Sequence, residues 1–373
     1  MFIIRTIFSM INYAAIACLL LSYLSPHISP QSFWFMAFFG LAYPIFLAIN
    51  ILFVIFWAVQ FKLRFLFSLI AIVLGLSHFN TFFQVNIKNA SLNNNADSSV
   101  MVKVMSYNVR LFDLYNWSHN KETRDKMFGL IKEETPDILC TQEFFNDDSK
   151  EFNTLDTLVK LQKAKNFHAE YTTTHNKVHH WGIATFSSYP IIEKGKIIFE
   201  DNSNNICIYT DLKVNDDTIR IYNMHLQSIH FRPQDYKFMD EVNNPEDEKP
   251  TKDEIEEKSK GIVKRLKDAF LKRSFQAESV AQHISHSPYP VVVCGDFNDT
   301  PSSYTYATIS NGLNDAFVES GNGLGRTYIG AFPSFRIDYI LHSREFKAYE
   351  FHTIKEELSD HFPVTCYLGM KQH

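Results

Sequence analysis

The chain has 373 residues with 36 basic and 41 acidic side chains, and its charges are concentrated in one part. Residues 1–96 contain no Asp or Glu and only four basic residues, so the remainder has 32 basic and 41 acidic residues and a net charge of −9. This excess of acid counts against a nuclease that holds nucleic acid tightly through many phosphate contacts. The five cysteines form no CxxC pair and lack zinc-ligand spacing, which excludes a cysteine zinc site.

The N-terminal part contains apolar runs without a charged residue at positions 7–24, 33–61 and 65–83. About 20 apolar residues cross the hydrocarbon core of a bilayer, so each run is long enough to span it. A cleaved signal peptide is the alternative for the first run, but further apolar runs follow at once and no small-residue cleavage pattern is present. The sequence therefore predicts a membrane anchor of three transmembrane helices within residues 1–87.

The basic residues of this part predict its orientation. Arg5 precedes the first run, and Lys62 and Arg64 separate the second from the third, whereas residues 25–32 contain neither Lys nor Arg. The positive-inside rule then places the N-terminus and the second loop in the cytoplasm. Three crossings would leave the C-terminal domain on the other side, which predicts a multi-pass protein of the bacterial inner (plasma) membrane with a periplasmic or extracytoplasmic domain.

A polar segment separates the apolar part from the rest of the chain. Residues 88–99 are rich in Asn and Ser without periodicity and are predicted to form a linker. Within residues 100–373, short β-rich runs alternate with amphipathic helical stretches at 122–136 and 258–284. Many strands with few βαβ repeats indicate an α/β sandwich in which sheets are covered by helices.

A charged insertion is predicted at about residues 228–273. Residues 240–257 are strongly acidic, and residues 258–273 are strongly basic. One interpretation is a solvated loop followed by a helix with a charged outer face. The other is a flexible lid beside the active site.

Polar side chains lie at the ends of many predicted strands. They are Asn108, Glu143, His225, Asp296, Asn298, Asp338, Asp360 and His361. Each alone has an ordinary explanation as a turn, salt-bridge or core residue, but burying several carboxylates without a compensating cation is unfavourable. Oxygen ligands without Cys suit Mg²⁺ or Mn²⁺, and magnesium sites commonly include substrate phosphate.

The C-terminal part resembles the endonuclease/exonuclease/phosphatase superfamily, which includes deoxyribonuclease I-like enzymes. The resemblance covers about residues 100–370 and is carried by the ordered segments SYNV, TQEF, FSSYPI, NMHLQS, GDFNDTP, FRIDYIL and LSDHFPV. It implies a magnesium-dependent phosphoesterase. It also implies a four-layer α/β/β/α sandwich in which two mixed sheets face each other and the site lies at one end.

The resemblance implies a role for each of these polar residues. Glu143 would be the principal metal ligand, with Asn108 beside it at the metal or phosphate and Asp360 assisting the metal. Asp296 is similar to the acid that aligns or deprotonates the attacking water. Asn298 is similar to the residue that orients water and phosphate.

The remaining catalytic positions concern the histidines. His225 resembles a histidine that binds the scissile phosphate, and Asp338 resembles an acid that orients a histidine. His361 is similar to a residue that acts either as a base or as a donor to the transition state. The resemblance leaves both roles of His361 open.

The predicted reaction is hydrolysis of a phosphodiester or phosphomonoester by in-line attack of activated water. Nucleic acid is the family's commonest substrate, whereas the lipid bilayer as a partner favours a lipid or headgroup phosphoester, as for a sphingomyelinase-like or polyprenyl-phosphate-directed enzyme. A non-catalytic membrane partner that retains the fold is a further alternative, and the complete set of site residues argues against it. A transporter subunit is disfavoured because the apolar runs carry no charge.

Overall fold

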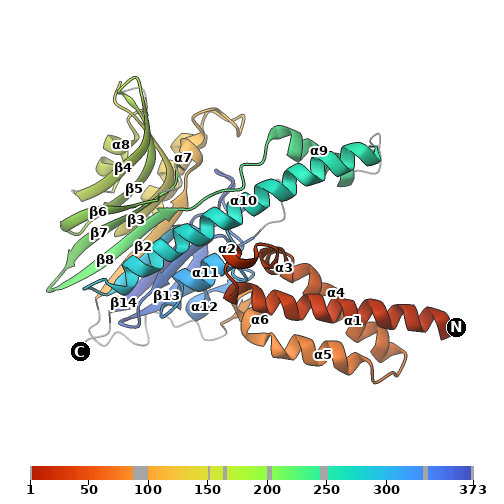
Figure 1. Cartoon of the computed structure of the whole chain (residues 1–373). Coiled ribbons are helices and arrows are strands. Elements are labelled where there is room, and N and C mark those ends of the chain that lie inside the picture. Colours follow the sequence, from red (N-terminus) through yellow and green to blue (C-terminus); the bar gives the residue numbers. More distant parts are fainter. Residues whose placement is uncertain are drawn as a thin grey trace.

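The computed structural model describes residues 2–86, 100–149, 152–162, 166–199, 204–243, 251–330 and 335–370. Residues 2–82 form helices, called here the N-terminal bundle, and residues 100–370 form the α/β domain (Figure 1). The predicted linker at 88–99 and residues 244–250 of the predicted insertion lie outside the described residues.

Two mixed sheets of six strands each form the centre of the α/β domain. The first sheet has the order β10 (Asn314–Asp315), β12 (Asp338–His342), β9 (Val291–Asp296), β8 (Asp217–His225), β7 (Ile206–Val214) and β6 (Ile191–Ile198). The second has the order β13 (Phe346–Thr353), β14 (Val364–Met370), β2 (Met101–Asn108), β3 (Ile138–Asp147), β5 (His179–Ser187) and β4 (Asn166–His175). The pairs β8–β9 and β2–β3 are parallel, and the other described pairs in these sheets are antiparallel.

Helices cover the outer faces of the two sheets. On the first sheet lie α10 (Lys252–Ser285) and α11 (Tyr304–Ile309), and on the second lie α7 (Thr123–Glu134) and α8 (Thr154–Leu161). Figure 1 shows α10 running along the first sheet and continuing past it, together with α9 (Pro233–Asn243). The short helices η3 (Arg110–Asp113) and α12 (Ala316–Ser320) complete the α/β domain. The predicted α/β fold with two mixed sheets is thus confirmed.

The alternation of apolar side chains along the strands explains this layering. On β2, Val102 and Val104 belong to the core between the two sheets. Met105 and Tyr107 point the other way and pack beneath α7 and α8. Successive side chains of a strand face opposite sides of the sheet. A strand with apolar residues at both odd and even positions is therefore buried on both faces.

The N-terminal bundle consists of short and long helices. They are α1 (Phe2–Leu24), η1 (Ser25–His27), α2 (Pro30–Phe33), α3 (Met36–Leu41), α4 (Tyr43–Val59), α5 (Phe65–Leu74) and α6 (Leu76–Phe82). In Figure 1, α1, α4 and α5 extend away from the two sheets. The short β1 (Gln84–Val85) then pairs with β11 (Asn322–Gly323) of the α/β domain.

The bundle has a small apolar core around Leu19, Tyr43 and Ala71, buries several polar side chains beside it and exposes many apolar side chains. Asn12, which is buried, donates from Nδ2 to Ser68 Oγ at 2.6 Å and accepts from Trp57 Nε1 at 2.9 Å. On the outside, Leu52 is 64% exposed and Ile70 is 56% exposed. Buried polar side chains that bond between helices, together with many exposed apolar side chains, are typical of helices that pack in lipid.

The prediction of three transmembrane helices is wrong for the described residues. Only Arg5–His27, which contains most of α1 and η1, is one continuous helix long and apolar enough to cross a membrane among the described residues. The pair α5 and α6 is a second candidate only if two helices bent by 65° count as one span. The second apolar run begins at the last residue of α2 and is divided into α3 and α4, and α4 has 17 residues. Pro44 lies in the first turn of α4, where its missing N–H and its ring prevent α3 from continuing.

This correction also removes the basis of the predicted orientation. The extracytoplasmic placement depended on three crossings, and the structure does not support a multi-pass arrangement with a periplasmic domain. Hydropathy detects apolar composition but not a break in the helix, so a long apolar run predicts one span even where the backbone forms two helices.

The base of the bundle is attached to the α/β domain. Gln31 Nε2 donates to the Leu271 carbonyl oxygen of α10 at 2.6 Å. Arg336 donates from Nη2 to the Thr81 carbonyl oxygen at 2.8 Å and from Nη1 to Asp315 at 2.7 Å. The bundle and the α/β domain are therefore in direct contact at residues that precede the predicted linker.

Candidate active site

The structure brings the predicted site residues together at one end of the two sheets. In the first sheet, the register sets Asp296 at the end of β9 opposite His225 of β8 and opposite Asp338 of β12. In the second sheet, Asn108 ends β2 and Glu143 lies on β3. Asn298 follows β9, and Asp360 and His361 precede β14. Strand pairing fixes the first three side chains, Asn298 follows Asp296 directly along the chain, and the contact between the sheets adds the residues of the second sheet.

Asp296 lies at the centre of the cluster. Its Oδ1 accepts from the backbone N–H of Asn298 at 2.8 Å, and its Oδ2 accepts from Asn108 Nδ2 at 3.0 Å and from Asn298 Nδ2 at 3.2 Å. His225 Nε2 and His361 Nε2 each lie 3.7 Å from Oδ2. Burial raises the pKa of Asp296 to about 6, while His361 opposes this shift and Asp338 adds to it.

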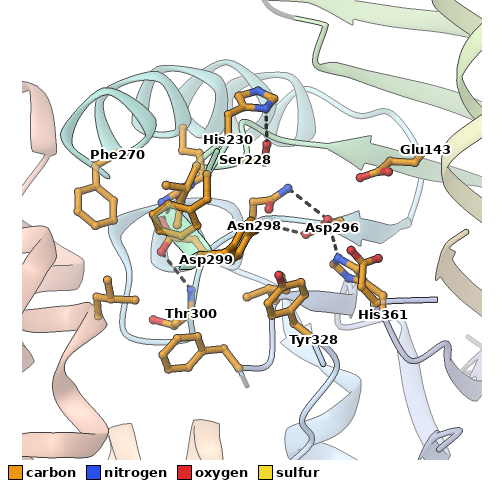
Figure 2. Close-up of a pocket in the computed structure, with 18 residues that line it drawn as sticks. Glu143, Ser228, His230, Phe270, Asp296, Asn298, Asp299, Thr300, Tyr328 and His361 are labelled. Carbon is orange, nitrogen blue, oxygen red and sulfur yellow. Dashed lines mark hydrogen bonds and ion pairs between the residues drawn. The ribbon is translucent and has the colours of Figure 1, made fainter. Parts of the chain in front are cut away.

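His361 is held by Asp338. The two side chains are hydrogen-bonded between Nδ1 and Oδ2 at 2.9 Å, and both are buried. Burial disfavours the charged imidazole, but the carboxylates of Asp338 and Asp296 outweigh it and raise the pKa of His361 well above its ordinary value. His361 therefore carries a proton at neutral pH, with Nε2 directed toward Asp296 (Figure 2).

The backbone around the cluster adopts uncommon conformations. Gly295 has a φ of +146°, and a Cβ there would overlap the carbonyl oxygen of Met224 on the neighbouring strand. Glu143 has a φ of 48° at an irregularity in the pairing of β3 with β5, and Asn298 has a φ of 53°. Strained non-glycine residues of this kind persist where the surrounding structure holds them, commonly at functional sites.

The donor set fits a hard divalent cation. Ligand atoms of Asp296, Asp338 and His361 lie within 4.8 Å of one another, and Glu143 Oε1 lies 3.3 Å from Asn108 Nδ2. Asp338 Oδ1 and His225 Nε2 are buried without a hydrogen-bond partner among the described residues. Buried polar atoms normally have hydrogen-bond partners. The carboxylate oxygen of Asp338 is therefore suited to a cation, and the imidazole nitrogen of His225 to an anionic group such as phosphate. Since His361 Nδ1 is already bonded to Asp338, the carboxylate oxygens of Asp296, Asp338 and the neighbouring Glu143 are the candidates to hold the cation.

Arg110 was not predicted from the sequence. Its Nε lies 3.3 Å from Asp360 Oδ2, and its backbone N–H donates to Asn108 Oδ1 at 3.1 Å. Its guanidinium also lies over the ring of Trp117, 4.7 Å from the centroid. Arg110 thus contacts both Asn108 and Asp360, the two residues predicted to lie beside Glu143 at the metal. A metal-ligand role for Asn108 and Asp360 stays a prediction. The segment SYNVR contains no signal that separates this arginine from a surface residue.

A cavity opens beside the cluster (Figure 2). Glu143, Asp296, Asn298, Asp360 and His361 line it, and so do residues of the predicted insertion, namely Ser228, Ile229, His230, Phe231 and Tyr236. The insertion therefore contributes a wall of the site, and its action as a lid stays a prediction.

Comparisons with known proteins show the family. Residues 105–361 match the Endonuclease/Exonuclease/phosphatase family, and the chain belongs to it. Members of this family are phosphoesterases, which makes a hydrolase the expected class of enzyme. Residues 5–82 match a domain of unknown function, DUF8431. No curated protein matched the chain.

Solved structures share the fold of the α/β domain. The human Nocturnin catalytic domain is 18% identical with a TM-score of 0.52, covering 73% of this chain and 94% of that chain. A family protein from Bacteroides thetaiotaomicron is 17% identical with a TM-score of 0.51, covering 74% and 99%. ANGEL2, described as a 2',3'-cyclic phosphatase, is 16% identical with a TM-score of 0.50, covering 74% and 97%. At these identities the likeness establishes the fold alone.

Proposed function

We propose that the protein is a divalent-metal-dependent phosphoesterase that hydrolyses its substrate by in-line attack of water on phosphorus. The observation that carries this proposal is the convergence of Asp296, His361, His225 and Glu143 within one cluster from both sheets. The intact cluster also argues against a non-catalytic protein that retains the fold.

The geometry supports a role for each side chain. Asp296, with a pKa raised to about 6, is ionised at neutral pH and basic enough to accept a proton from water. His361 stays protonated and donates to a phosphoryl oxygen as charge develops there. His225 Nε2, which has no hydrogen-bond partner among the described residues and lies 3.7 Å from both Glu143 and Asp296, binds the phosphate, and Asn298 orients the water. Mg²⁺ or Mn²⁺ held chiefly by Glu143 would supply Lewis-acid polarisation of the phosphoryl group.

Removal of divalent cations is expected to abolish the activity. Without a cation, the carboxylates of Glu143 and Asp296 repel the anionic substrate, so hydrolysis of bis-p-nitrophenyl phosphate should fall by at least about 10²-fold. The measurement is the rate of p-nitrophenol release by the full chain after treatment with EDTA and after addition of Mg²⁺, Mn²⁺ or Ca²⁺. Full activity in EDTA, with the metal content verified as zero, would contradict the proposal.

We further propose that the N-terminal bundle inserts into a lipid bilayer. The support is the apolar helix within residues 5–27, the exposed apolar side chains of α4 and α5, and the hydrogen bonds of Asn12 and Trp57 inside the bundle. In water, an apolar surface of this size would favour aggregation.

Membrane insertion predicts resistance to alkaline extraction. The full chain should remain in the membrane pellet after a carbonate wash and should dissolve only in detergent, because apolar burial rather than ion pairing holds it there. An integral and a peripheral membrane protein of the same cells serve as controls. Release of the chain by carbonate alone would show that the bundle does not insert.

A further inference from the structure

The cavity that contains the catalytic cluster extends beyond it. It has a volume of about 230 Å³, and six apolar residues line it beside the polar Ser228, His230, Arg273, Asp299 and Thr300. The apolar residues are Leu41, Ile229, Phe231, Phe270, Phe335 and Ile337. Figure 2 shows Phe270 close to the N-terminal helices, whereas Glu143 and His361 lie at the opposite end. Hydrolysis of the phosphoester requires only the catalytic cluster, so the apolar residues of the cavity have no role in the reaction itself.

The N-terminal bundle forms one wall of this cavity. Leu41, the last residue of α3, lines it. The helix is closely packed on the α/β domain, since Phe38 contacts Phe270 edge to face with ring centroids 5.3 Å apart. A Cβ at Gly40 would overlap the carbonyl oxygen of Ser302, so only glycine permits this approach. The wall is therefore a fixed part of the site.

The end of the cavity near Phe270 is poorly suited to a second phosphate. Arg273 is the one Arg or Lys among the described residues that line the cavity, and its side chain is buried. Its Nε lies 3.0 Å from Asp299 Oδ2, and its Nη1 donates to the Gln227 carbonyl oxygen at 2.8 Å. A polynucleotide is held by several contacts between its phosphates and cationic side chains. An apolar chain is instead bound because its transfer from water to an apolar surface is favourable.

We propose that the substrate is an amphiphilic phosphoester, with its phosphate at the catalytic cluster and an alkyl, acyl or prenyl chain between Leu41 and Phe270. This inference rests on the proposed phosphoesterase function and adds its substrate class. The cavity has room for on the order of eight water-sized groups, so it binds the part of the chain nearest the phosphate.

The reaction is a hydrolysis and needs no further reactant. The oxygen of water forms a bond to phosphorus while a phosphorus–oxygen ester bond breaks. The proton of the water passes to Asp296, and the leaving oxygen takes a proton from bulk water. The products are an alcohol and a phosphate that carries one ester fewer.

The test compares alkyl p-nitrophenyl phosphates that differ only in chain length. The full chain in lipid nanodiscs is assayed with the methyl, butyl, hexyl and octyl esters, each below its micelle concentration, with Mg²⁺ or Mn²⁺. We expect kcat/KM to rise by about fourfold per methylene until the cavity is filled. Equal kcat/KM for all esters, or faster cleavage of a DNA or RNA oligonucleotide than of the octyl ester, would overturn the substrate class.

Variants of Leu41 test the wall itself. Leu41→Gln should reduce the ratio of octyl to methyl hydrolysis at least about tenfold, because a polar group then meets the chain. Leu41→Trp should move the optimum to shorter chains by filling the cavity. Leu52→Gln, a matched change on the outer face of α4, should leave the ratio unchanged. A ratio unaffected by both Leu41 variants would overturn the proposal even if the parent enzyme prefers long chains.

The outcomes separate this inference from the function on which it rests. No hydrolysis of any ester with Mg²⁺ or Mn²⁺ would refute both, whereas hydrolysis without chain-length preference would refute the substrate class alone. Vesicles of dioleoylphosphatidylglycerol are assayed in parallel. Cleavage in the vesicles identifies a bilayer lipid as the source of the chain, and cleavage of the dispersed esters alone identifies a soluble amphiphile; both support the class.

Discussion

Asp296→Asn is expected to lower kcat for a simple phosphodiester by about 10³-fold or more without unfolding the protein. Asn retains the size of the side chain and can still accept from the backbone N–H of Asn298. It has no charge and accepts no proton from water, so both the base and a candidate cation ligand are lost. The measurement is kcat on bis-p-nitrophenyl phosphate with Mg²⁺, together with a thermal unfolding curve.

A matched control is available on the neighbouring strand. Asp217 is exposed at the beginning of β8, at the end of the strand away from His225. Asp217→Asn changes the net charge equally and should leave kcat unaltered. If Asp296→Asn retained activity within about tenfold of the parent, the base would have been assigned to the wrong residue.

Asp338→Asn is expected to lower kcat at neutral pH by about 10²-fold. The carboxylate of Asp338 is the main contribution that raises the pKa of His361 above its ordinary value of 6.5. Without it, fewer carboxylates oppose the effect of burial, so the pKa of His361 falls and a smaller fraction of the imidazole carries a proton at neutral pH. A neutral His361 no longer donates to the phosphoryl oxygen.

The pH profile distinguishes this effect from a structural one. In the parent, His361 is protonated across the neutral range, and activity falls on the acid side as Asp296 gains a proton near its pKa of about 6. In Asp338→Asn, activity should increase as the pH decreases toward the lowered pKa of His361, until Asp296 is protonated. The imidazole pKa is measured by NMR. If the pH dependence of activity were unchanged and kcat fell by the same factor at every pH, Asp338 would act only by orienting His361 and not through its charge.

Much of the α/β domain could be predicted because the alternation of apolar residues along its strands matches the burial of each face of its sheets. Val102 and Val104 alternate with Met105 and Tyr107 in the sequence as they do between the two faces of β2. Polar residues at strand ends were good candidates because strands of one sheet end at a common edge, as His225, Asp296 and Asp338 do. The contact of Asn108 with Asp296 joins residues 188 positions apart, and the ordered motifs indicated it only through the family resemblance.

The N-terminal bundle and the cavity wall could not be predicted in the same way. An apolar run has the same hydropathy whether it forms one span or breaks, and only the backbone shows the break at Ala42 before Pro44. The place of Leu41 in the cavity depends on the close approach that Gly40 allows. Arg110 likewise has no signature, because its contact with Asp360 depends on how two loops meet.

The most direct test of the metal-dependent site is anomalous diffraction from crystals of the full chain grown with Mn²⁺. We expect a peak about 2.1 Å from a carboxylate oxygen of Glu143, with Asp296 or a water bonded to it completing the coordination. A peak only at other residues, or no peak when Glu143 and Asp296 are ordered and Mn²⁺ supports catalysis, would contradict the account.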